Sequence, residues 1–386
     1  MKQPQLSFTK AQGRTLLVQL LVMGGILWFC HLLFVNTQAN LASRNIASGF
    51  GFLAYEAGMP ISDALMPYTP ADTYGYAFFI GVLNTLYVSA VSIVLATLIG
   101  VVVGVARVSS NWLVARLAEI YVEVLRNIPL LLILFFTYGV VLAALPSPRR
   151  SLHWGVGLFL NNRGIYFPKI LPESGFWFIP AALVLGLVIS VIVHRKGTKR
   201  RKETGRALPS IRIGLVLTLG LPLLAALLLG LPASLELPVL KGFNFKGGSV
   251  IRPEFCALLI GLVLYTAAFI AENVRSGIQS VAKGQLDAAH ALGLPEGLIM
   301  RRVILPQALR VTIPSTTNDY ASLVKNSSLA VAIGYPDMVS VGGTIIGQND
   351  QAIEIIVMWM SVYLCINLLI SLFMNWLNAR VQLIGR

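Results

Sequence analysis

Residues 272–306 read ENVRSGIQSVAKGQLDAAHALGLPEGLIMRRVILP and separate two long apolar segments of the chain. The stretch is amphipathic and basic, and Gly and Pro interrupt it. Helix-favouring residues at 287–292 predict a short helix with Asp287 in its first turn, where the helix dipole favours negative charge. Gly293 and Pro295 predict the end of this helix, because Gly accepts left-handed backbone angles and Pro cannot continue the hydrogen-bond ladder.

A second short helix is expected at residues 296–304. It carries Arg301 and Arg302 and is expected to stop before Pro306. Two short helices joined by a sharp turn, held between membrane spans, would form a projecting knob that suits a binding partner. From composition alone, an ordinary cytoplasmic loop explains the stretch equally well.

The composition is that of an integral membrane protein. Of the 386 residues, 56% are hydrophobic and 12% are charged, whereas a soluble domain is about half apolar and about a quarter charged. A net charge of +14 would favour nucleic acid as the partner of a soluble protein. Here the Lys and Arg residues lie mostly between apolar segments, where membrane orientation explains them. The three Cys residues lie in apolar segments without paired spacing, so we expect no disulfide framework and no metal site.

Eight segments are interpreted as membrane spans. The first could be a cleaved signal peptide, but its apolar core is longer than that of a usual signal and no small-x-small site follows, which favours a retained span. The second carries Gly100 and Gly104, with Gly81 just before it, and small residues allow helices to approach closely in lipid. The expected spans are residues 15–35, 84–106, 117–145, 176–194, 213–231, 253–270, 320–341 and 353–377.

Residues 320–341 form the least hydrophobic of these spans, and polar residues and Pro336 interrupt them. Polar or irregular backbone at membrane depth is tolerated only where it is buried in protein or lines a cavity. We therefore interpret this span as the element that lines the transport pathway, in which a kink could form. The candidates for lining the pathway or contacting substrate are Asn318, Lys325, Asn326, Ser327 and Ser328.

Eight spans put both termini on the same side of the membrane. That side carries 21 Lys and Arg residues and the opposite side carries eight. The positive-inside rule then places both termini and residues 272–306 in the cytoplasm. The run RKGTKRRKETGR at residues 195–206 is expected to fix this orientation, with contact to anionic lipid as a weaker alternative. The loops 146–175 and 232–252 are then extracytoplasmic.

The order of motifs in residues 272–306 closely resembles the EAA loop of ABC-importer permeases, with Asp287 in place of the usual Glu. The flanking stretches AAFIAENVRSGIQSV, LPQALR and NDYASLVKNSSLA, together with RNIPLL at residues 126–131, resemble the polar-amino-acid branch of that family. The family often has Gln where this chain has Ile133, so polar contacts there are not carried over. In the family, the loop is a coupling helix that docks on the ATP-binding subunit. The resemblance therefore implies coupling to an ATPase by Asp287, Ala288, Ala289, Gly293, Ile304 and Pro306.

The resemblance covers residues 80–145 and 253–386, which would supply the five core helices of the permease fold. It implies an all-α integral membrane protein with about eight transmembrane helices. Residues 1–79 would add an N-terminal transmembrane helix and an extracytoplasmic segment. Residues 146–252 would be an insertion with two extra transmembrane helices and a basic cytoplasmic loop, similar to that of the larger permease of general L-amino-acid importers.

No G-x-x-x-x-G-K-[ST], H-E-x-x-H or Gly-x-Ser-x-Gly motif occurs in the chain, so we expect no enzyme activity and no cofactor in it. The resemblance implies that ATP and Mg²⁺ are bound by a partner ATPase dimer. It also implies a second homologous permease, identical or different, and a periplasmic or other extracytoplasmic amino-acid-binding protein. The expected location is the bacterial inner membrane, in contact with lipid and without nucleic acid.

Two other functions compete with an amino-acid ABC permease. An ion-coupled secondary transporter would need no ATPase and would be expected to show inverted repeats and charged residues at mid-membrane. The sequence shows no such repeat, and its charges cluster near span ends. The other alternative is a permease of the same fold that carries another small polar solute. Only the resemblance favours amino acids over such a solute.

Overall fold

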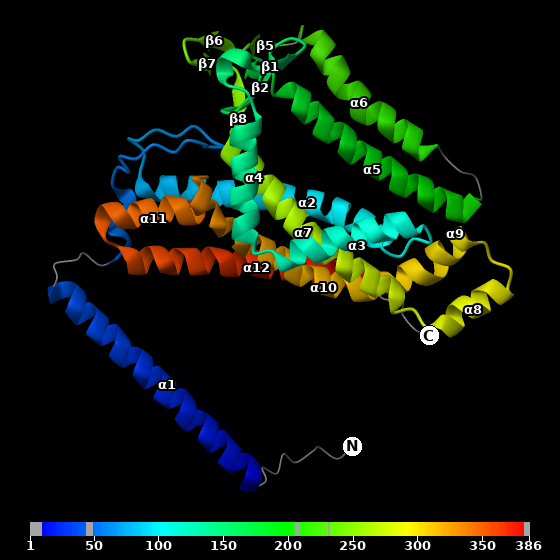
Figure 1. The fold of residues 1–386 in the computed structure, drawn as a ribbon, viewed down its shortest axis with the longest axis horizontal. Helices are drawn as coiled ribbons and strands as arrows, with labels where there is room; N and C mark the ends of the chain where they lie inside the picture. The colour runs from blue at the N-terminus through cyan, green and yellow to red at the C-terminus, as the bar shows by residue number, and fades with distance from the viewer. Residues whose placement is uncertain (1–9, 44–48, 205–208, 231, 382–386) are drawn as a thin grey trace. The chain divides into compact units, whose positions relative to one another are not determined.

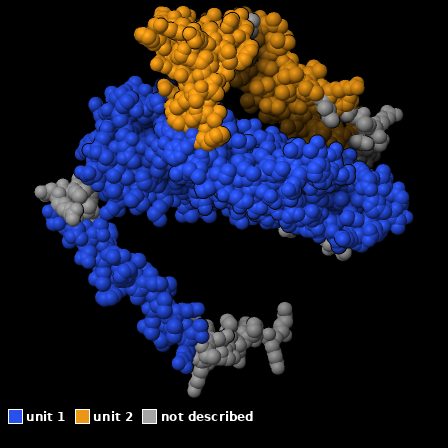
Figure 2. Space-filling model, in the orientation of Figure 1, with its two compact units in different colours: residues 1–135, 258–386 blue, residues 136–257 orange. Residues whose placement is uncertain are grey.

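The computed structural model describes residues 10–43, 49–204, 209–230 and 232–381. These residues are mostly helical and divide into two compact units (Figure 2). The first unit contains residues 1–135 and 258–386, and the second contains residues 136–257. Some of the Lys and Arg residues that were counted at the two termini and in the basic run lie outside the described residues. They are in residues 1–9, 205–208 and 382–386.

Helices α4 (Leu130–Ala144) and α7 (Pro253–Gln279) each have residues in both units (Figure 1). The segment before α2 contains the short 3₁₀ helix η1 (Phe50–Ala54). The other helices of the first unit are α1 (Lys10–Ser43), α2 (Tyr74–Ala106), α3 (Trp112–Asn127), α8 (Lys283–Ala291), α9 (Glu296–Ile299), α10 (Leu305–Asn326), α11 (Met338–Asn349) and α12 (Ala352–Val381).

Five of the described helices are long and apolar enough to cross a membrane. The count rises to seven if two bent pairs of helices, α3 with α4 and residues 296–333 with α11, each form one span. A further apolar stretch at residues 212–228 is shorter. A multi-pass helical membrane protein is therefore confirmed, and the count of eight spans stays a prediction. The five candidates cover residues 17–37, 74–106, 178–198, 253–279 and 352–381.

The prediction of one continuous span at residues 117–145 is wrong. Helix α3 ends at Asn127, Ile128 is extended with φ −99° and ψ 131°, and α4 begins at Leu130. Pro129 explains the break, because its ring disfavours helical backbone angles at the preceding residue.

The prediction of a span that starts at Tyr320 is also wrong. Residues 296–333 are helical throughout, and this helical stretch ends at Gly334, which has a left-handed φ of 79°. Asp337 then caps α11 by accepting a hydrogen bond from the Ser340 N–H (2.8 Å). Residues 296–333 and α11 meet at a bend of 53°, so a kink is present within the predicted pathway element.

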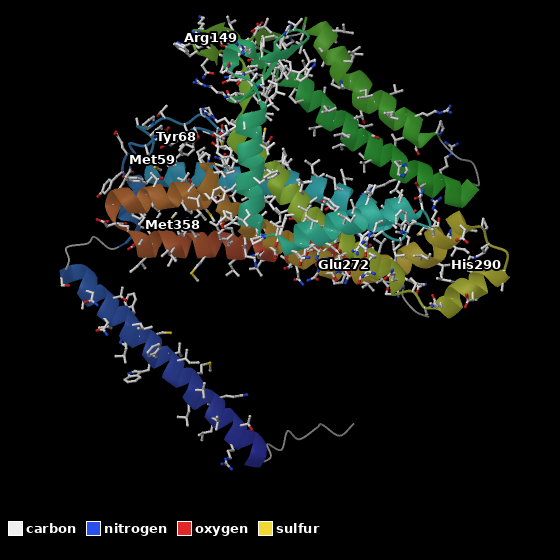
Figure 3. All side chains as sticks on the ribbon, in the orientation of Figure 1. Met59, Tyr68, Arg149, Glu272, His290 and Met358 are labelled. Atoms are coloured by element: carbon white, nitrogen blue, oxygen red, sulfur yellow. The ribbon has the colours of Figure 1, made fainter. Side chains whose placement is uncertain are left out.

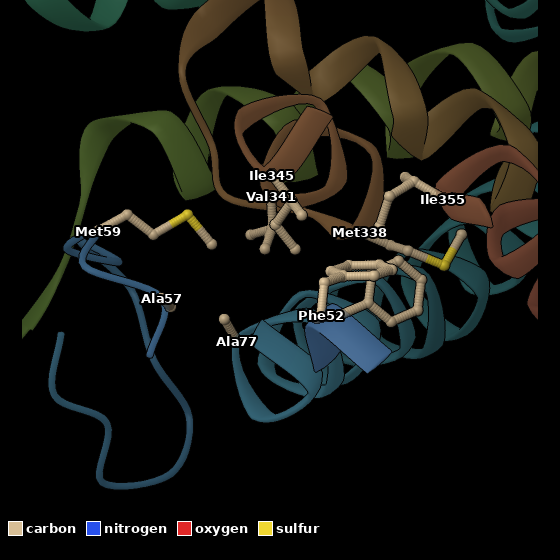
Figure 4. Close-up of a cluster of buried hydrophobic side chains, with 9 residues drawn as sticks. Phe52, Ala57, Met59, Ala77, Met338, Val341, Ile345 and Ile355 are labelled. Atoms are coloured by element: carbon tan, nitrogen blue, oxygen red, sulfur yellow. The ribbon is translucent and has the colours of Figure 1, made fainter. Parts of the chain in front are cut away.

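A buried apolar cluster holds α11 to α2 and to the segment before it (Figure 4). The kink is fixed by polar groups as well, because Asn84 of α2 is buried and donates to the carbonyl oxygens of Pro336 (2.8 Å) and Asp63 (2.6 Å). The Thr85 hydroxyl accepts the Met338 N–H (3.0 Å). The cluster consists of Phe52, Ala57, Met59, Ala77, Phe78, Met338, Val341, Ile345 and Ile355.

Among its described residues, the second unit contains a helical hairpin, α5 (Phe178–Thr204) and α6 (Ser210–Leu228), and eight short strands. Helix α5 continues through much of the basic run, because Lys and Arg are good helix formers.

The strands lie where loops were predicted, at residues 146–175 and 232–252, so that interpretation is wrong. A four-stranded antiparallel sheet has the order β1-β2-β3-β8, and β4-β5 and β6-β7 are separate antiparallel pairs. Apolar and aromatic residues on either side of an Asn-Asn-Arg-Gly turn are typical of a hairpin and explain β2 and β3. The strands are β1 (Leu152–Trp154), β2 (Leu158–Asn161), β3 (Gly164–Phe167), β4 (Lys169–Pro172), β5 (Ala233–Glu236), β6 (Val239–Lys241), β7 (Asn244–Lys246) and β8 (Ser249–Ile251).

Candidate functional site

The segment after α7 folds as the short helix α8, a tight turn and a second helical piece. The turn is a Schellman motif: the Gly293 N–H donates to the His290 carbonyl oxygen (2.8 Å), and the Leu294 N–H donates to the Ala289 carbonyl oxygen (3.3 Å). Gly293 has a φ of 70°, which only Gly adopts without strain. The predicted helix end at Gly293 is confirmed.

The loop presents small and apolar side chains at its surface. Ala289 is buried against the rest of the unit, whereas Asp287 and Ala288 are exposed. Leu292, at the tip of the turn, is 78% exposed. Asp287 is the fifth residue of α8, so its predicted place in the first turn is wrong: the helix starts earlier, at Lys283.

The second helical piece passes into α10 without stopping, contrary to the prediction of an end before Pro306. A π turn, η3 (Met300–Ile304), joins α9 to α10, and its Leu305 N–H donates to the Met300 carbonyl oxygen. Pro306 has no N–H, and its ring crowds the carbonyl group four residues back in a regular α-helix. The wider π turn before it relieves that crowding.

Two contacts fasten α8 to the helix that follows. The Gln307 side-chain amide donates to the Gln285 side-chain oxygen (2.5 Å) and to the Val303 carbonyl oxygen (2.9 Å). Across the turn, His290 Nδ1 lies 3.6 Å from a carboxylate oxygen of Glu296. The loop is therefore held as one piece with the start of α10.

Behind the loop, an ion network joins the end of α2 to the last turns of α7 (Figure 3, in which Glu272 is labelled). Glu272 forms an ion pair with Arg107, the residue that follows α2, and a second one with Arg275 at 2.5 Å. The side chains of Arg107 and Glu272 are only 12% and 21% exposed. Since partly buried pairs are screened less than exposed ones, this network fixes α7 relative to α2.

A polar cavity of 290 Å³ lies further along, between α7 and α10. Asn273, one turn beyond it on α7, donates to a carboxylate oxygen of Asp319 at 2.6 Å. The guanidinium of Arg126, from α3, lies 5.1 Å from the centre of the Phe269 ring. The cavity is lined by Tyr265, Thr266, Phe269, Asp319, Ser322, Leu323 and Asn326.

Comparison with known proteins identifies the family. Residues 202–383 match the family described as "Binding-protein-dependent transport system inner membrane component". The chain is 47% identical over 371 residues to the "General L-amino acid transport system permease protein AapQ" of Rhizobium johnstonii, covering 96% of this chain and 92% of that one. This chain belongs to that family. The "Glutamate/glutamine/aspartate/asparagine transport system permease protein BztB" of Rhodobacter capsulatus is 37% identical over 400 residues, covering 95% and 92%.

As a member of the binding-protein-dependent family, the chain is a non-catalytic membrane subunit. The matched residues 202–383 include α8, the Schellman turn, the π turn and the polar cavity. The recognition made from residues 272–306 is thereby confirmed.

The five residues predicted for the pathway lie in different surroundings. Asn326 lines the cavity, whereas Asn318 and Lys325 are exposed. Ser327 is fully buried and donates to the Val324 carbonyl oxygen (2.8 Å), and Ser328 donates to the Lys325 carbonyl oxygen (2.7 Å). Substrate contact by any of them stays a prediction.

The sequence reasoning missed most of the cavity lining. Tyr265 and Phe269 lie four residues apart on α7, and Asp319, Ser322 and Asn326 follow one another at helical spacing on α10. Residues at these spacings share a helix face. A search for polar and aromatic faces on the two flanking helices would have found them.

Replacing Glu272 with Gln is expected to lower the free energy of unfolding by about 1–3 kcal/mol, because the shielded Arg107 then loses its counter-charge. The midpoint of thermal unfolding in mild detergent measures this effect. The control is Glu296→Gln in the same region, whose side chain is 83% exposed; an exposed pair contributes little, so its midpoint should not move. Equal shifts for the two variants would contradict the role of the network.

Proposed function

We propose that this chain is the transmembrane permease subunit of an ATP-driven ABC importer that carries polar L-amino acids across the inner membrane. The observation that carries the proposal is the relation to a general L-amino-acid permease along nearly the whole of both chains. A second relative is named for glutamate, glutamine, aspartate and asparagine. The polar lining of the cavity between α7 and α10 supports a polar solute.

The proposed assembly contains two copies of an ATP-binding subunit, which bind ATP and Mg²⁺ and hydrolyse the ATP. A second permease, homologous to this chain or identical with it, completes the membrane part. An extracytoplasmic amino-acid-binding protein delivers the substrate, and lipid surrounds the spans. The excess of Lys and Arg supports an orientation with both termini and the α8 loop in the cytoplasm.

In the proposed mechanism, ATP binding closes the ATPase dimer and moves the coupling loop of residues 272–306. Asp287, Ala288 and Gly293 would contact the ATPase, and the buried Ala289 would support them from behind. Ile304 and Pro306 join the loop to α10. Because Gln307 ties α8 to the start of α10, a displacement of α8 is passed to the helix that lines the cavity. ATP thereby shifts a two-state equilibrium at a distance from the pathway.

The test is reconstitution. The chain is co-expressed with its ATPase and partner permease, purified in mild detergent, identified by mass spectrometry and placed in proteoliposomes with the binding protein. We expect ATP-dependent accumulation of polar L-amino acids. If the chain purified alone, and uptake depended on an ion gradient and not on ATP, the chain would be a secondary transporter. If ATP drove the uptake of another solute instead, the assignment as an ABC permease would stand and the assignment of amino acids as its substrates would be wrong.

Replacing Asn326 with Leu is expected to raise the KM for uptake about tenfold, because an apolar side chain in the polar cavity wall cannot form a hydrogen bond with a polar solute. Radiolabelled amino-acid uptake measures the effect, and ATPase association should not change. Asn318→Leu, an identical change at an exposed position of the same helix, is the control. If only the control raised the KM, the pathway would not run along this cavity.

A further inference from the structure

The two strand-forming segments carry a charge that membrane orientation does not explain. Of the eight Lys and Arg residues assigned to the extracytoplasmic side, seven lie in residues 146–175 and 232–252, which contain only two acidic residues, Glu173 and Glu236. Extracytoplasmic loops of membrane proteins are ordinarily poor in Lys and Arg. A basic excess on this side therefore requires another explanation. The seven residues are Arg149, Arg150, Arg163, Lys169, Lys241, Lys246 and Arg252.

These segments, which we call the strand layer, form an ordered platform. The Phe245 ring packs between Phe159 (4.6 Å between ring centres) and Tyr166 (4.9 Å). The Tyr166 hydroxyl donates to the Asn244 side-chain oxygen at 2.9 Å, which joins β3 to β7. Asn161 is fully buried and accepts the Arg163 N–H (2.8 Å), which fixes the hairpin between β2 and β3. The backbone positions that carry the charged residues of the β2–β3 hairpin and of β7 are thus fixed relative to one another.

The strand layer combines basic and aromatic side chains at its surface. Six of the seven basic residues are exposed, all except the partly buried Arg252. The Arg149 guanidinium, labelled in Figure 3, lies 4.5 Å from the centre of the Phe243 ring, and that ring is 72% exposed. Trp154 on the edge strand β1 is 56% exposed. Arg and aromatic residues are the types enriched at protein interfaces.

A cavity of 200 Å³ in the same layer is lined in part by basic residues. Its lining includes Arg163, Arg252 and the adjacent Gly247 and Gly248. An acidic group, Glu236, lies beside it, with a carboxylate oxygen 3.0 Å from where a Cβ on Gly247 would sit. Arg163 gives the cavity an exposed basic residue, and a guanidinium binds a carboxylate through charge-assisted hydrogen bonds.

We propose that the strand layer is the docking surface for the extracytoplasmic amino-acid-binding protein, and that Arg163 and Lys246 contact carboxylates on it. The proposal rests on the proposed function, which supplies this partner and the side of the membrane. In the proposed orientation the layer is extracytoplasmic and the coupling loop is cytoplasmic, because α7, a candidate span, lies between them in the chain. The partner's face is expected to be rich in Asp and Glu, since complementary charge speeds encounter and fixes register.

The experiment uses the whole complex of this chain, its partner permease and its ATPase in nanodiscs, with the purified binding protein as the probe. Arg163→Glu combined with Lys246→Glu is expected to raise the Kd of the binding protein about tenfold or more. Raising NaCl from about 50 mM to about 300 mM should weaken binding to the wild type more than to the variant. Basal ATPase activity without the binding protein should not change.

Two variants keep the result specific. Arg163→Lys with Lys246→Arg preserves the charge and should bind as the wild type does. Arg195→Glu with Lys196→Glu reverses two exposed charges in α5 of the same insertion, on the proposed cytoplasmic side, and should also leave the Kd unchanged. Carbodiimide, which joins Lys to carboxylates in direct contact, should link Lys246 to Asp or Glu residues of the binding protein.

Each result decides the inference. An unchanged Kd and salt dependence for the Glu variant overturns the docking surface, while stimulation of the wild-type ATPase by the binding protein still supports the proposed function. A variant that binds normally but needs anionic lipid for activity would assign the layer to lipid headgroups, and would likewise overturn it. A wild-type complex that no amino-acid-binding protein stimulates overturns the proposed function, and the docking surface with it.

Discussion

Replacing Gly293 with Asp is expected to weaken association with the ATPase by about a hundredfold, and to abolish ATP-driven uptake, while the chain still inserts and folds. The turn projects from the unit, and a Cβ built at Gly293 meets nothing within 4 Å in this chain. The carboxylate would be buried only when the partner docks. An uncompensated charge buried in an interface costs about 3–5 kcal/mol, which corresponds to at least a hundredfold in Kd.

The control for this substitution is Gly293→Asn. Asn has nearly the same shape as Asp and, like Asp, accepts the left-handed φ of 70° better than other residues that have a Cβ. The two variants therefore place equal strain on the Schellman turn and differ in charge. We expect Asn to retain most of the uptake, with a loss of a few-fold at most.

Co-purification of the ATPase with the tagged chain, followed by an uptake assay at matched expression, distinguishes the outcomes. Loss of the ATPase with Asp and its retention with Asn assigns the effect to the interface. Equal loss with both variants would instead assign Gly293 to the turn geometry alone. Normal uptake with Asp would remove residues 272–306 from the coupling site.

The parts of the loop that the sequence predicted correctly depend on neighbours in the chain. A helix over residues 287–292 and its end at Gly293 follow from propensity and from the backbone freedom of Gly, and both are present. The predicted helix end before Pro306 was wrong. A Pro near the start of a helix is compatible with a continuing helix when a π turn precedes it.

What the sequence could not predict depends on contacts between distant residues. Glu272 and Arg107 are 165 positions apart, and neither residue's own neighbourhood reveals the pair. The strand layer was missed for a similar reason: its segments are short, and β3 pairs with β8 across the two helices of the insertion. The cavity was found only in part, because polar residues were sought only in the least hydrophobic span. Three of the seven lining residues lie on the more apolar α7.

Replacing Gly104 with Leu is expected to cause the largest loss of stability among these substitutions, about 3 kcal/mol, the upper range for overpacking a well-filled site. A Cβ at Gly104 would lie 2.6 Å from the Val274 Cβ and 2.7 Å from the Ala271 carbonyl oxygen of α7. Gly100, one turn earlier, is equally tight, with a Cβ position 2.7 Å from that of Ile270. Two glycines four residues apart thus let α2 and α7 touch along their backbones.

The contact at Gly104 involves a carbonyl oxygen, which cannot rotate away as a side chain can, so the helices themselves must separate. Separation would also pull Arg107, one turn further along α2, from Glu272 of α7. We therefore expect Gly104→Leu to lower both the midpoint of thermal unfolding in detergent and the amount of folded protein, and Gly104→Ala to have a smaller effect of the same sign. Gly343→Leu is the matched control, because a Cβ at Gly343 of α11 meets nothing within 4 Å. If both Leu variants had the same midpoint, close contact between α2 and α7 would not be what holds this unit together.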